Sequence, residues 1–212
     1  MNEPLITMID YGGSNLRSVQ KAFEAVGARV QATADPDEVR RAAKLVLPGV
    51  GAFGAGMAAL HSRGLDEAVR AAAQAGTLLL GICLGMQILF DESEEMGQHA
   101  GLGLLPGRVV RFAADLFNEG HPLKVPHVGW NSIDHDERHP LLTGVVPGAH
   151  AYFVHSYYCA PLDTADVLAW ANYGEPFAAI AARSNVLGIQ FHPEKSQSVG
   201  LRILRNFIDI KP

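Results

Sequence analysis

Apolar segments of strand length alternate with segments of helical spacing through the first part of the chain. Strands are predicted over residues 5–9, 28–33, 44–47 and 77–82. Helices are predicted over residues 16–26, 35–42 and 57–75, and another begins over residues 84–90. Strands and helices that alternate in this way build a parallel or mixed sheet covered on both faces. The sequence therefore predicts an α/β fold with an open, mostly parallel sheet flanked by helices.

From about residue 104 the pattern changes to short strands separated by turns. We expect these strands to extend the sheet or to form a small antiparallel layer, and we expect a final helix over residues 201–210. No internal repeat or linker interrupts the 212 residues, so a single domain, residues 1–212, is predicted. The strands lie over or around residues 108–112, 133, 152–154, 167–169, 178–181 and 187–191, with proline-rich turns at 120–128 and 139–148.

The composition excludes several classes of function. The net charge is −5 and the basic residues are scattered, whereas nucleic-acid binders carry a concentrated basic patch. The N-terminus lacks the basic segment of a signal peptide, and the longest apolar stretch, residues 77–90, is short for a membrane span. A cytoplasmic protein without nucleic-acid or membrane partners is expected. Its two cysteines, Cys83 and Cys159, should then be free thiols.

The segment Gly81-Ile82-Cys83-Leu84-Gly85 joins an apolar strand to a helix. A reactive residue with glycines two positions before and after it has the pattern of a nucleophile elbow, here with cysteine in place of serine. Small neighbours let the chain turn sharply and hold the nucleophile exposed, and a helix N-terminus favours the reactive thiolate. Taken alone, Cys83 could equally be a buried strand cysteine, since free cysteine is often buried.

A second segment places His192 at the end of an apolar strand, with Glu194 two residues later and Pro193 between them. Residues two apart in extended chain point to the same side, so Glu194 can hold one ring nitrogen of His192 while the other faces a nucleophile. A solvated turn with an unrelated ion pair is the alternative. Together with the cysteine elbow, the pair supplies the nucleophile, base and orienting group of a catalytic triad.

The glycine-rich loop of residues 47–54 reads literally as G-x-G-x-x-G. A dinucleotide site is rejected, because the motif does not follow the first strand and no acidic residue ends a strand some twenty positions later. Such a loop at a strand end can instead present backbone N–H groups to an anion. Paired with the N–H of Leu84, it predicts an oxyanion hole.

These segments together resemble the class I, or triad-type, glutamine amidotransferases, whose fold is flavodoxin-like. The elbow and the His-Pro-Glu segment mark this superfamily, and the surrounding residues resemble its glutaminase subunits of imidazole glycerol phosphate synthase, from histidine biosynthesis. The likeness covers nearly the whole chain, apart from Gly13-Ser14, where the family pattern differs. It rests on Asp10-Tyr11-Gly12 with Asn15-Leu16, Pro48 to Phe53, Gly81 to Gln87, Pro126 to Asn131, Tyr152 to Tyr157 and Gln190 to Ser196.

The resemblance implies a role for each matching residue. Cys83 would be the nucleophile, His192 the base and then the acid, and Glu194 the orienting carboxylate. Asn15 and Lys195 would face a separate cyclase subunit that receives ammonia in a heterodimer, and no cofactor or metal is expected. The oxyanion N–H groups and the glutamine pocket would come from Gly51, Leu84, Gln87, Glu95, His155, Ser156 and Tyr157.

Three other functions remain open from the sequence. They are a glutaminase of another synthase, for example in pyridoxal phosphate or anthranilate synthesis, a stand-alone γ-glutamyl hydrolase, and a binding protein that kept the fold. The stretch from His135 to His139 lacks the spacing of a metal motif and is interpreted as a solvated loop. Trp130 and Trp170 are expected in the core, and Cys159 is expected to pack there.

Overall fold

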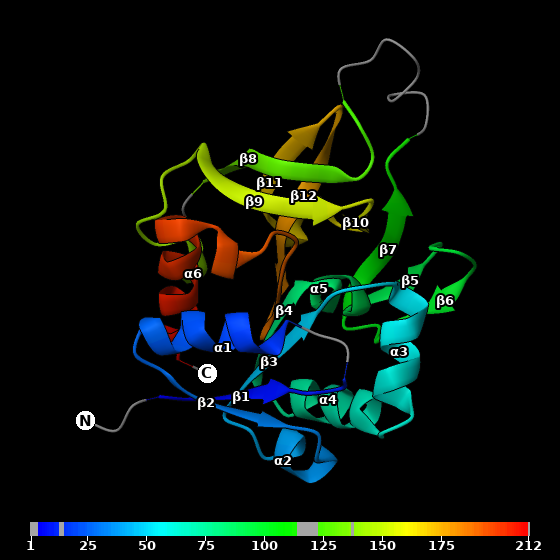
Figure 1. The fold of residues 1–212 in the computed structure, drawn as a ribbon, viewed down its shortest axis with the longest axis vertical. Helices are drawn as coiled ribbons and strands as arrows, with labels where there is room; N and C mark the ends of the chain where they lie inside the picture. Colours follow the sequence, from blue (N-terminus) through cyan, green and yellow to red (C-terminus); the bar gives the residue numbers. More distant parts are fainter. Residues whose placement is uncertain (1–3, 13–14, 114–122, 137, 212) are drawn as a thin grey trace.

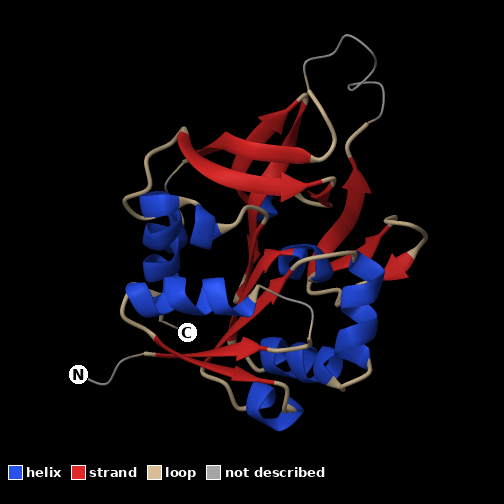
Figure 2. Cartoon of the chain, viewed as in Figure 1, coloured by secondary structure: helices blue, strands red, loops and turns tan. Residues whose placement is uncertain are grey.

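A nine-stranded sheet forms the centre of the molecule in this computed structural model, which describes residues 4–12, 15–113, 123–136 and 138–211 (Figures 1 and 2). The strand order is β2-β1-β3-β4-β13-β12-β11-β8-β9. Neighbours from β2 to β13 pair in parallel, and neighbours from β13 to β9 pair antiparallel. The strands are β1 Leu5–Ile9, β2 Arg29–Thr33, β3 Lys44–Gly49, β4 Leu78–Cys83, β8 His127–His135, β9 Ala149–His155, β11 Val167–Tyr173, β12 Glu175–Arg183 and β13 Val186–Ile189.

Helices cover both faces of the parallel half of this sheet. Along β3 the side chains alternate, so that Val46 joins the core under α1 and α6, while Leu45 and Leu47 join the core under α3 and α4. Phe23 of α1 and Phe207 of α6 meet edge to face at 6.2 Å between ring centroids. The helices are α1 Leu16–Ala25, α2 Pro36–Arg40, α3 Phe53–His61, α4 Leu65–Gln74, α5 Leu84–Ile88 and α6 Gln197–Asp209.

A second sheet of four strands lies beside α5, in the order β10-β7-β5-β6. Strands β5 and β7 pair in parallel and the other neighbours pair antiparallel. Short 3₁₀ helices occur at Pro140–Leu142, Thr164–Asp166 and Pro193–Lys195. The strands of this sheet are β5 Phe90–Ser93, β6 His99–Ala100, β7 Leu105–Arg111 and β10 Tyr157–Pro161. Of the later strands, some extend the main sheet as expected, while β7 and β10 join β5 and β6 in a smaller sheet that is mixed and not purely antiparallel.

Several local predictions were wrong. The helix predicted over residues 57–75 is two helices, because Gly64 turns the chain with φ of +65° between α3 and α4. The helix predicted over residues 84–90 ends at Ile88, and Phe90 already begins β5. Of the turn predicted at 120–128, residues 120–122 lie outside the described ranges, and His127 begins β8. Trp130 and Trp170 are not core residues, since they are 47% and 37% exposed.

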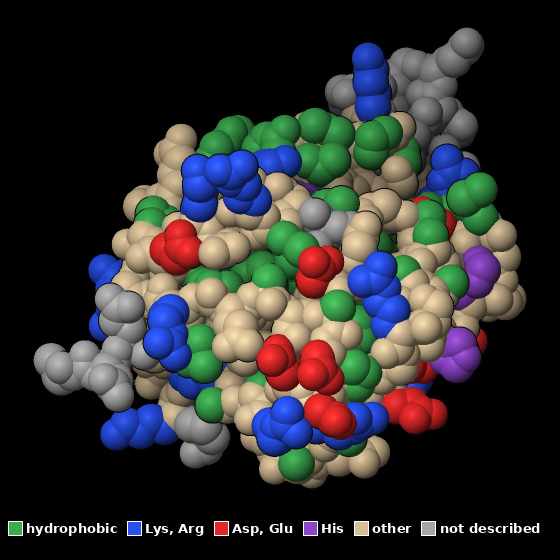
Figure 3. Space-filling model, turned by 60° about the horizontal axis from the view of Figure 1, so that its bottom comes forward, with side chains coloured by type: hydrophobic (Ala, Val, Ile, Leu, Met, Phe, Trp, Pro, Cys, Tyr) green, Lys and Arg blue, Asp and Glu red, His purple; other side chains and the backbone are tan. Residues whose placement is uncertain are grey.

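The surface carries mixed charges. On the face shown in Figure 3, acidic and basic side chains are interspersed and hydrophobic side chains gather toward its upper edge. Within the described ranges, no helix has both the length and the hydrophobicity needed to cross a membrane.

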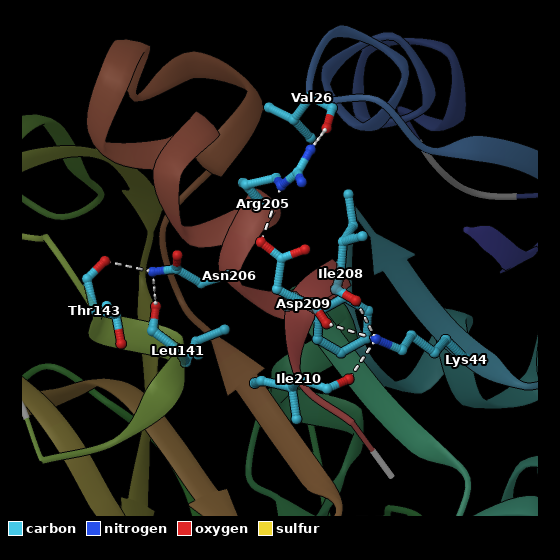
Figure 4. A network of polar contacts seen from close by, with 10 residues as sticks. Val26, Lys44, Leu141, Thr143, Arg205, Asn206, Ile208, Asp209 and Ile210 are labelled. Carbon is cyan, nitrogen blue, oxygen red and sulfur yellow. Dashed lines mark hydrogen bonds and ion pairs between the residues drawn. The ribbon is translucent and has the colours of Figure 1, made fainter. Parts of the chain in front are cut away.

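The C-terminal end of α6 is tied to the sheet by a buried lysine. Lys44 on β3 points its Nζ at the last carbonyls of the helix and donates to Phe207 O at 3.1 Å, to Ile208 O and to Ile210 O at 2.5 Å (Figure 4). These carbonyls have no partners within the helix, and a cation suits the negative end of its dipole. Burial lowers the pKa of Lys44, and the charge of Asp209 opposes that shift.

Lys44→Met is expected to destabilise the fold by about 2–4 kcal/mol, because it leaves buried carbonyls without their charged donor. Urea unfolding of the full chain, followed by circular dichroism, measures the difference. Arg40→Met is the matched control, because the side chain of Arg40 forms an exposed ion pair with Asp37 and no other hydrogen bond or ion pair among the described residues. It should change the free energy of unfolding by less than about 0.5 kcal/mol. Equal effects of the two variants would contradict this role of Lys44.

Candidate active site

Cys83 lies at the junction between β4 and α5 in a strained backbone conformation. Its φ is +55° and its ψ is −113°, a region that residues with a side chain rarely adopt. The glycines on either side make the turn possible. A Cβ on Gly85 would lie 1.8 Å from Leu47 O, and a Cβ on Gly81 would lie 2.6 Å from Gly85 O. The elbow therefore packs directly against β3, and its strained residue is the one that carries a thiol.

His192 and Glu194 follow β13, the strand that pairs with β4. The His192 N–H donates to Tyr152 O at 2.9 Å, and a 3₁₀ turn then brings Glu194 back under the imidazole. Nδ1 of His192 lies 2.9 Å from Oε1 of Glu194, and the side chain of His192 also hydrogen-bonds with Cys83. The side chains of His192 and Glu194 are 7% and 2% exposed. The structure thus brings the three predicted triad residues into one line.

The protonation of His192 suits a thiolate partner. Burial by itself would lower the pKa of this imidazole, but hydrogen bonds with Cys83 and Glu194, together with their negative charges, raise its pKa to about 9. At neutral pH His192 is therefore protonated and faces the cysteine. A protonated His192 places an acid for a leaving group beside the cysteine.

Neighbouring side chains hold Glu194 and His192 in place. Asn15 Nδ2 donates to Glu194 Oε1 at 3.3 Å. The hydroxyl of Ser196 donates to His192 O at 2.7 Å and accepts from the N–H of Tyr152 at 3.0 Å. The other carboxylate oxygen of Glu194 is buried and has no partner among the described residues. These contacts fix the position of His192 through its backbone as well as through its ring.

The glycine-rich loop lies beside Cys83. Gly49 is paired with Cys83 in the register of β3 and β4, and the chain then turns through Gly51, whose φ is +102°. Leu84 is the first residue of α5, so its N–H has no partner within the helix. Both Gly51 and Leu84 line the cavity above Cys83. The far end of the loop is held by Glu95, whose Oε2 accepts from the Phe53 N–H at 2.7 Å.

A cavity of about 330 Å³ opens over Cys83 and His192. It brings together every residue of the predicted oxyanion hole and glutamine pocket. Within it, Gln87 Nε2 donates to Tyr157 O at 2.9 Å and to Gln190 Oε1 at 3.2 Å. Glu194 stands behind His192 and does not line the cavity. The predicted residues that line it are Gly51, Cys83, Leu84, Gln87, Glu95, His155, Ser156, Tyr157 and His192.

The cavity also has walls that the sequence did not single out. Val50, Pro126 and Val154 contribute to its lining. Tyr11 lies beneath it, and a Cβ on Gly49 would be 2.4 Å from the Tyr11 hydroxyl. That hydroxyl is buried without a partner in the described part of the chain, and burial followed by the charge of Cys83 raises its pKa. Tyr11 belongs to the Asp-Tyr-Gly motif, but the motif alone gives no reason to place it under the cysteine.

The two residues expected to face a partner have contacts of their own. Lys195 lines the cavity, and its Nζ lies 5.8 Å from the centroid of the Tyr152 ring. Asn15 contacts the triad through Glu194. The unusual Gly13-Ser14 pair lies outside the described residues. Cys159 is fully buried, as expected, and burial followed by the charge of Cys83 raises the pKa of its thiol well above the usual value.

Two buried histidines, His155 on the cavity wall and His127 behind it, give a pH prediction. Burial lowers the pKa of His155 to about 3 and that of His127 to about 4, against about 6.5 in an unfolded chain. Because the pKa of each histidine is lower in the folded chain than in the unfolded one, the two residues stabilise the fold above about pH 6.5. This stabilisation is lost as the pH falls toward about 4. The free energy of unfolding of the wild type should therefore decrease by more than about 1 kcal/mol from pH 7 to pH 4.5. His127→Asn should show a smaller decrease in urea unfolding, and an identical slope would contradict the prediction.

Comparisons with known proteins agree with this geometry. The model of the family "Glutamine amidotransferase class-I" matches residues 7–210. The imidazole glycerol phosphate synthase subunit HisH of Syntrophotalea carbinolica is 54% identical over 206 residues, which are 97% of this chain and 100% of the relative. The corresponding subunit of Methylococcus capsulatus is 50% identical over 211 residues, covering 98% and 97% of the two chains.

Solved structures show the same fold at low sequence identity. PurLQS from Thermotoga maritima superimposes with a TM-score of 0.75 at 21% identity, covering 98% of each chain. A crystal structure described as a glutamine amidotransferase gives a TM-score of 0.73 at 20% identity, covering 96% of this chain and 97% of that one. The chain belongs to the class I glutamine amidotransferase family and, within it, to the HisH subunits of imidazole glycerol phosphate synthase.

Proposed function

We propose that this chain hydrolyses glutamine to glutamate and ammonia through a thioester on Cys83, and that it delivers the ammonia to a separate cyclase subunit. The observation that carries the proposal is the line of Cys83, His192 and Glu194, of which Cys83 and His192 line the cavity. Membership of the HisH family supports the pathway, and the cavity lined by the predicted pocket residues supports the substrate.

In the first half-reaction the Cys83 thiolate attacks the side-chain amide carbon of glutamine. The carbonyl oxygen becomes an oxyanion, for which the N–H groups of Gly51 and Leu84 are the proposed donors. One such donor typically contributes about 2.7–4 kcal/mol to the transition state. The imidazolium of His192 then gives its proton to the amide nitrogen, the C–N bond breaks, ammonia leaves, and the γ-glutamyl thioester remains.

In the second half-reaction His192 is neutral and acts as a base. It takes a proton from a water molecule as that water attacks the thioester carbon, and the same N–H groups hold the second oxyanion. The C–S bond breaks, glutamate is released, and the thiolate–imidazolium pair is restored. Glu194 keeps the ring of His192 oriented through both halves and stabilises its positive charge.

The remaining pocket residues are proposed to recognise the rest of glutamine. His155 ends β9, and Ser156 and Tyr157 follow it along one wall. Gln87 lies on α5, and Glu95 lies beside the glycine-rich loop. Asn15 and Lys195 are the residues we propose nearest the cyclase, in a heterodimer. The triad contact made by Asn15 gives the partner a short physical route to Glu194.

The test is glutamate release from glutamine by the pure chain, alone and with a cyclase subunit loaded with its ribonucleotide ligand. We expect strong stimulation by the loaded cyclase, because ammonia released without an acceptor is lost to water. Equal activity with and without the partner would instead support a stand-alone γ-glutamyl hydrolase. Absence of turnover in every condition would contradict the proposed chemistry.

A further inference from the structure

His127 and His155 face each other across two neighbouring strands. They are direct partners in the antiparallel register of β8 and β9, which lie side by side in Figure 1. Nδ1 of His127 lies 2.9 Å from Nε2 of His155. The two residues are 2% and 6% exposed. Only His155 lines the cavity, and His127 lies behind it and outside the cavity lining.

The partners of the pair decide which ring nitrogens carry protons. Nδ1 of His155 lies 3.0 Å from Tyr157 O, and because a carbonyl only accepts, this nitrogen must be the donor. The neutral ring then has a lone pair on Nε2, which requires a proton on Nδ1 of His127. Nε2 of His127 is left as an acceptor, and Asn131 Nδ2 approaches it at 3.4 Å. The hydrogen bonds therefore all run in one direction, with Asn131 donating to His127, His127 to His155, and His155 to Tyr157 O.

The Asn131 amide and the surrounding rings fix that direction. Asn131 Nδ2 also donates to Asn172 O at 2.8 Å, and its oxygen accepts from the Ser132 N–H at 2.8 Å, so the amide is held in one orientation. The ring of His127 is stacked between Phe153 and Tyr173, with centroids 5.0 and 3.9 Å away. The low pKa values of both histidines keep them neutral at physiological pH.

The series ends on a carbonyl that shapes the glutamine pocket. Tyr157 O accepts from both His155 Nδ1 and Gln87 Nε2, so both of its lone pairs are used. Tyr157, Ser156 and His155 together form one wall of the cavity. If His155 carried its proton on Nε2 instead, its Nδ1 lone pair would face the lone pairs of Tyr157 O. This wall of the cavity would then lose the hydrogen bond between His155 and Tyr157 O, and the facing lone pairs would repel each other.

We propose that His127 is a positioning residue, which holds His155 in the Nδ1–H tautomer and thereby fixes the Ser156–Tyr157 backbone where glutamine binds. This inference rests on the proposed glutaminase function for its kinetic consequence. The tautomer itself is a property of the folded chain and needs no substrate.

The first test is long-range ¹H–¹⁵N NMR on the full chain labelled with ¹⁵N-histidine, which distinguishes the two neutral tautomers. The His155 signal is assigned by its absence in His155→Asn. The wild type should show the proton of His155 on Nδ1, where Tyr157 O and His127 both favour it. His127→Phe keeps a stacked ring but has no donor, so it should increase the fraction of His155 protonated on Nε2, and an unchanged fraction would overturn the proposal. A wild-type His155 protonated on Nε2 would overturn the proposal.

The second test is steady-state kinetics in the complex with the loaded cyclase subunit. Loss of one well-aligned hydrogen bond corresponds to about tenfold in binding. His127→Phe should therefore raise KM for glutamine by about tenfold, while kcat changes by less than about threefold, because the triad is untouched. His127→Asn places an amide donor near the position of Nδ1, and it should restore KM to within about threefold of the wild type.

The variants separate positioning from general damage to the fold. A structural effect alone would lower kcat together with affinity and would affect both variants equally, and that result would overturn the proposal. An unchanged KM in His127→Phe would also overturn it. If the wild type shows the Nδ1–H tautomer but does not hydrolyse glutamine, the proposed function fails while the assignment of the tautomer stands.

Discussion

Cys83→Ala is expected to lower glutamine hydrolysis by roughly 10⁴-fold or more, because no other described group occupies the position of the nucleophile. The only other cysteine, Cys159, is fully buried in the second core cluster and has its thiol pKa raised by that burial. Stability should change by about 1 kcal/mol or less, since the substitution removes one sulfur and leaves the strained backbone in place. The measurement is kcat with the loaded cyclase, beside urea unfolding of each protein.

Cys159→Ala is the matched control for this substitution. It removes a buried thiol of the same kind outside the cavity, and kcat should stay within about threefold of the wild type. A small alkylating agent should likewise react with the wild type and with Cys159→Ala, but not with Cys83→Ala. Turnover by Cys83→Ala within tenfold of the wild type would rule out the cysteine mechanism.

Glu194→Gln is expected to lower kcat by about 10³- to 10⁴-fold with a small change in KM. In serine proteases, the corresponding change of the orienting carboxylate to an amide costs about 10⁴-fold, because the histidine takes the wrong tautomer. Here Oε1 of Glu194 lies 2.9 Å from Nδ1 of His192, so an amide could donate to that nitrogen and place the proton on the side of Cys83. Glu92→Gln removes an exposed carboxylate from β5 and serves as the control, with kcat unchanged.

The same substitution should change how stability depends on pH. The pKa of His192 is raised to about 9 in the folded chain, above about 6.5 in the unfolded one. Its contribution to stability is therefore fully present below about pH 6.5 and is lost as the pH rises through 9. Glu194 supplies part of that shift, so Glu194→Gln should lose less stability than the wild type between pH 6.5 and pH 9.5. An unchanged kcat together with an unchanged pH dependence would contradict the role given to Glu194.

The placement of Cys83, His192 and Glu194 could be predicted because it depends on local sequence. The sequence itself shows the glycines that flank Cys83 and the two-residue spacing between His192 and Glu194. The alternation of strands and helices further predicts that the strand ends meet at one edge of the sheet. The break at Gly64 was missed because the alanine-rich helical spacing continues on both sides of it. Short strands such as β6 depend on partners far along the chain, so local sequence gives them little signal.

The contact between His127 and His155 is the clearest example of a feature that could not be predicted from the sequence. Both residues lie in segments that were recognised, yet their contact exists only because β8 and β9 pair in one register, which a single sequence does not fix. The exposure of Trp130 depends on the same pairing, since its strand lies near the edge of the sheet next to β9. The position of Tyr11 under the cysteine likewise arises from the close approach of Gly49 and Gly85.

The most direct test of the central claim is to find the thioester. The complex with the loaded cyclase is quenched with acid during turnover of glutamine, and its intact mass and peptides are analysed by mass spectrometry. The mechanism predicts one γ-glutamyl group on the peptide that contains Cys83, present also in Cys159→Ala and absent in Cys83→Ala. A γ-glutamyl group on another residue, or full turnover by Cys83→Ala without any adduct, would contradict the account.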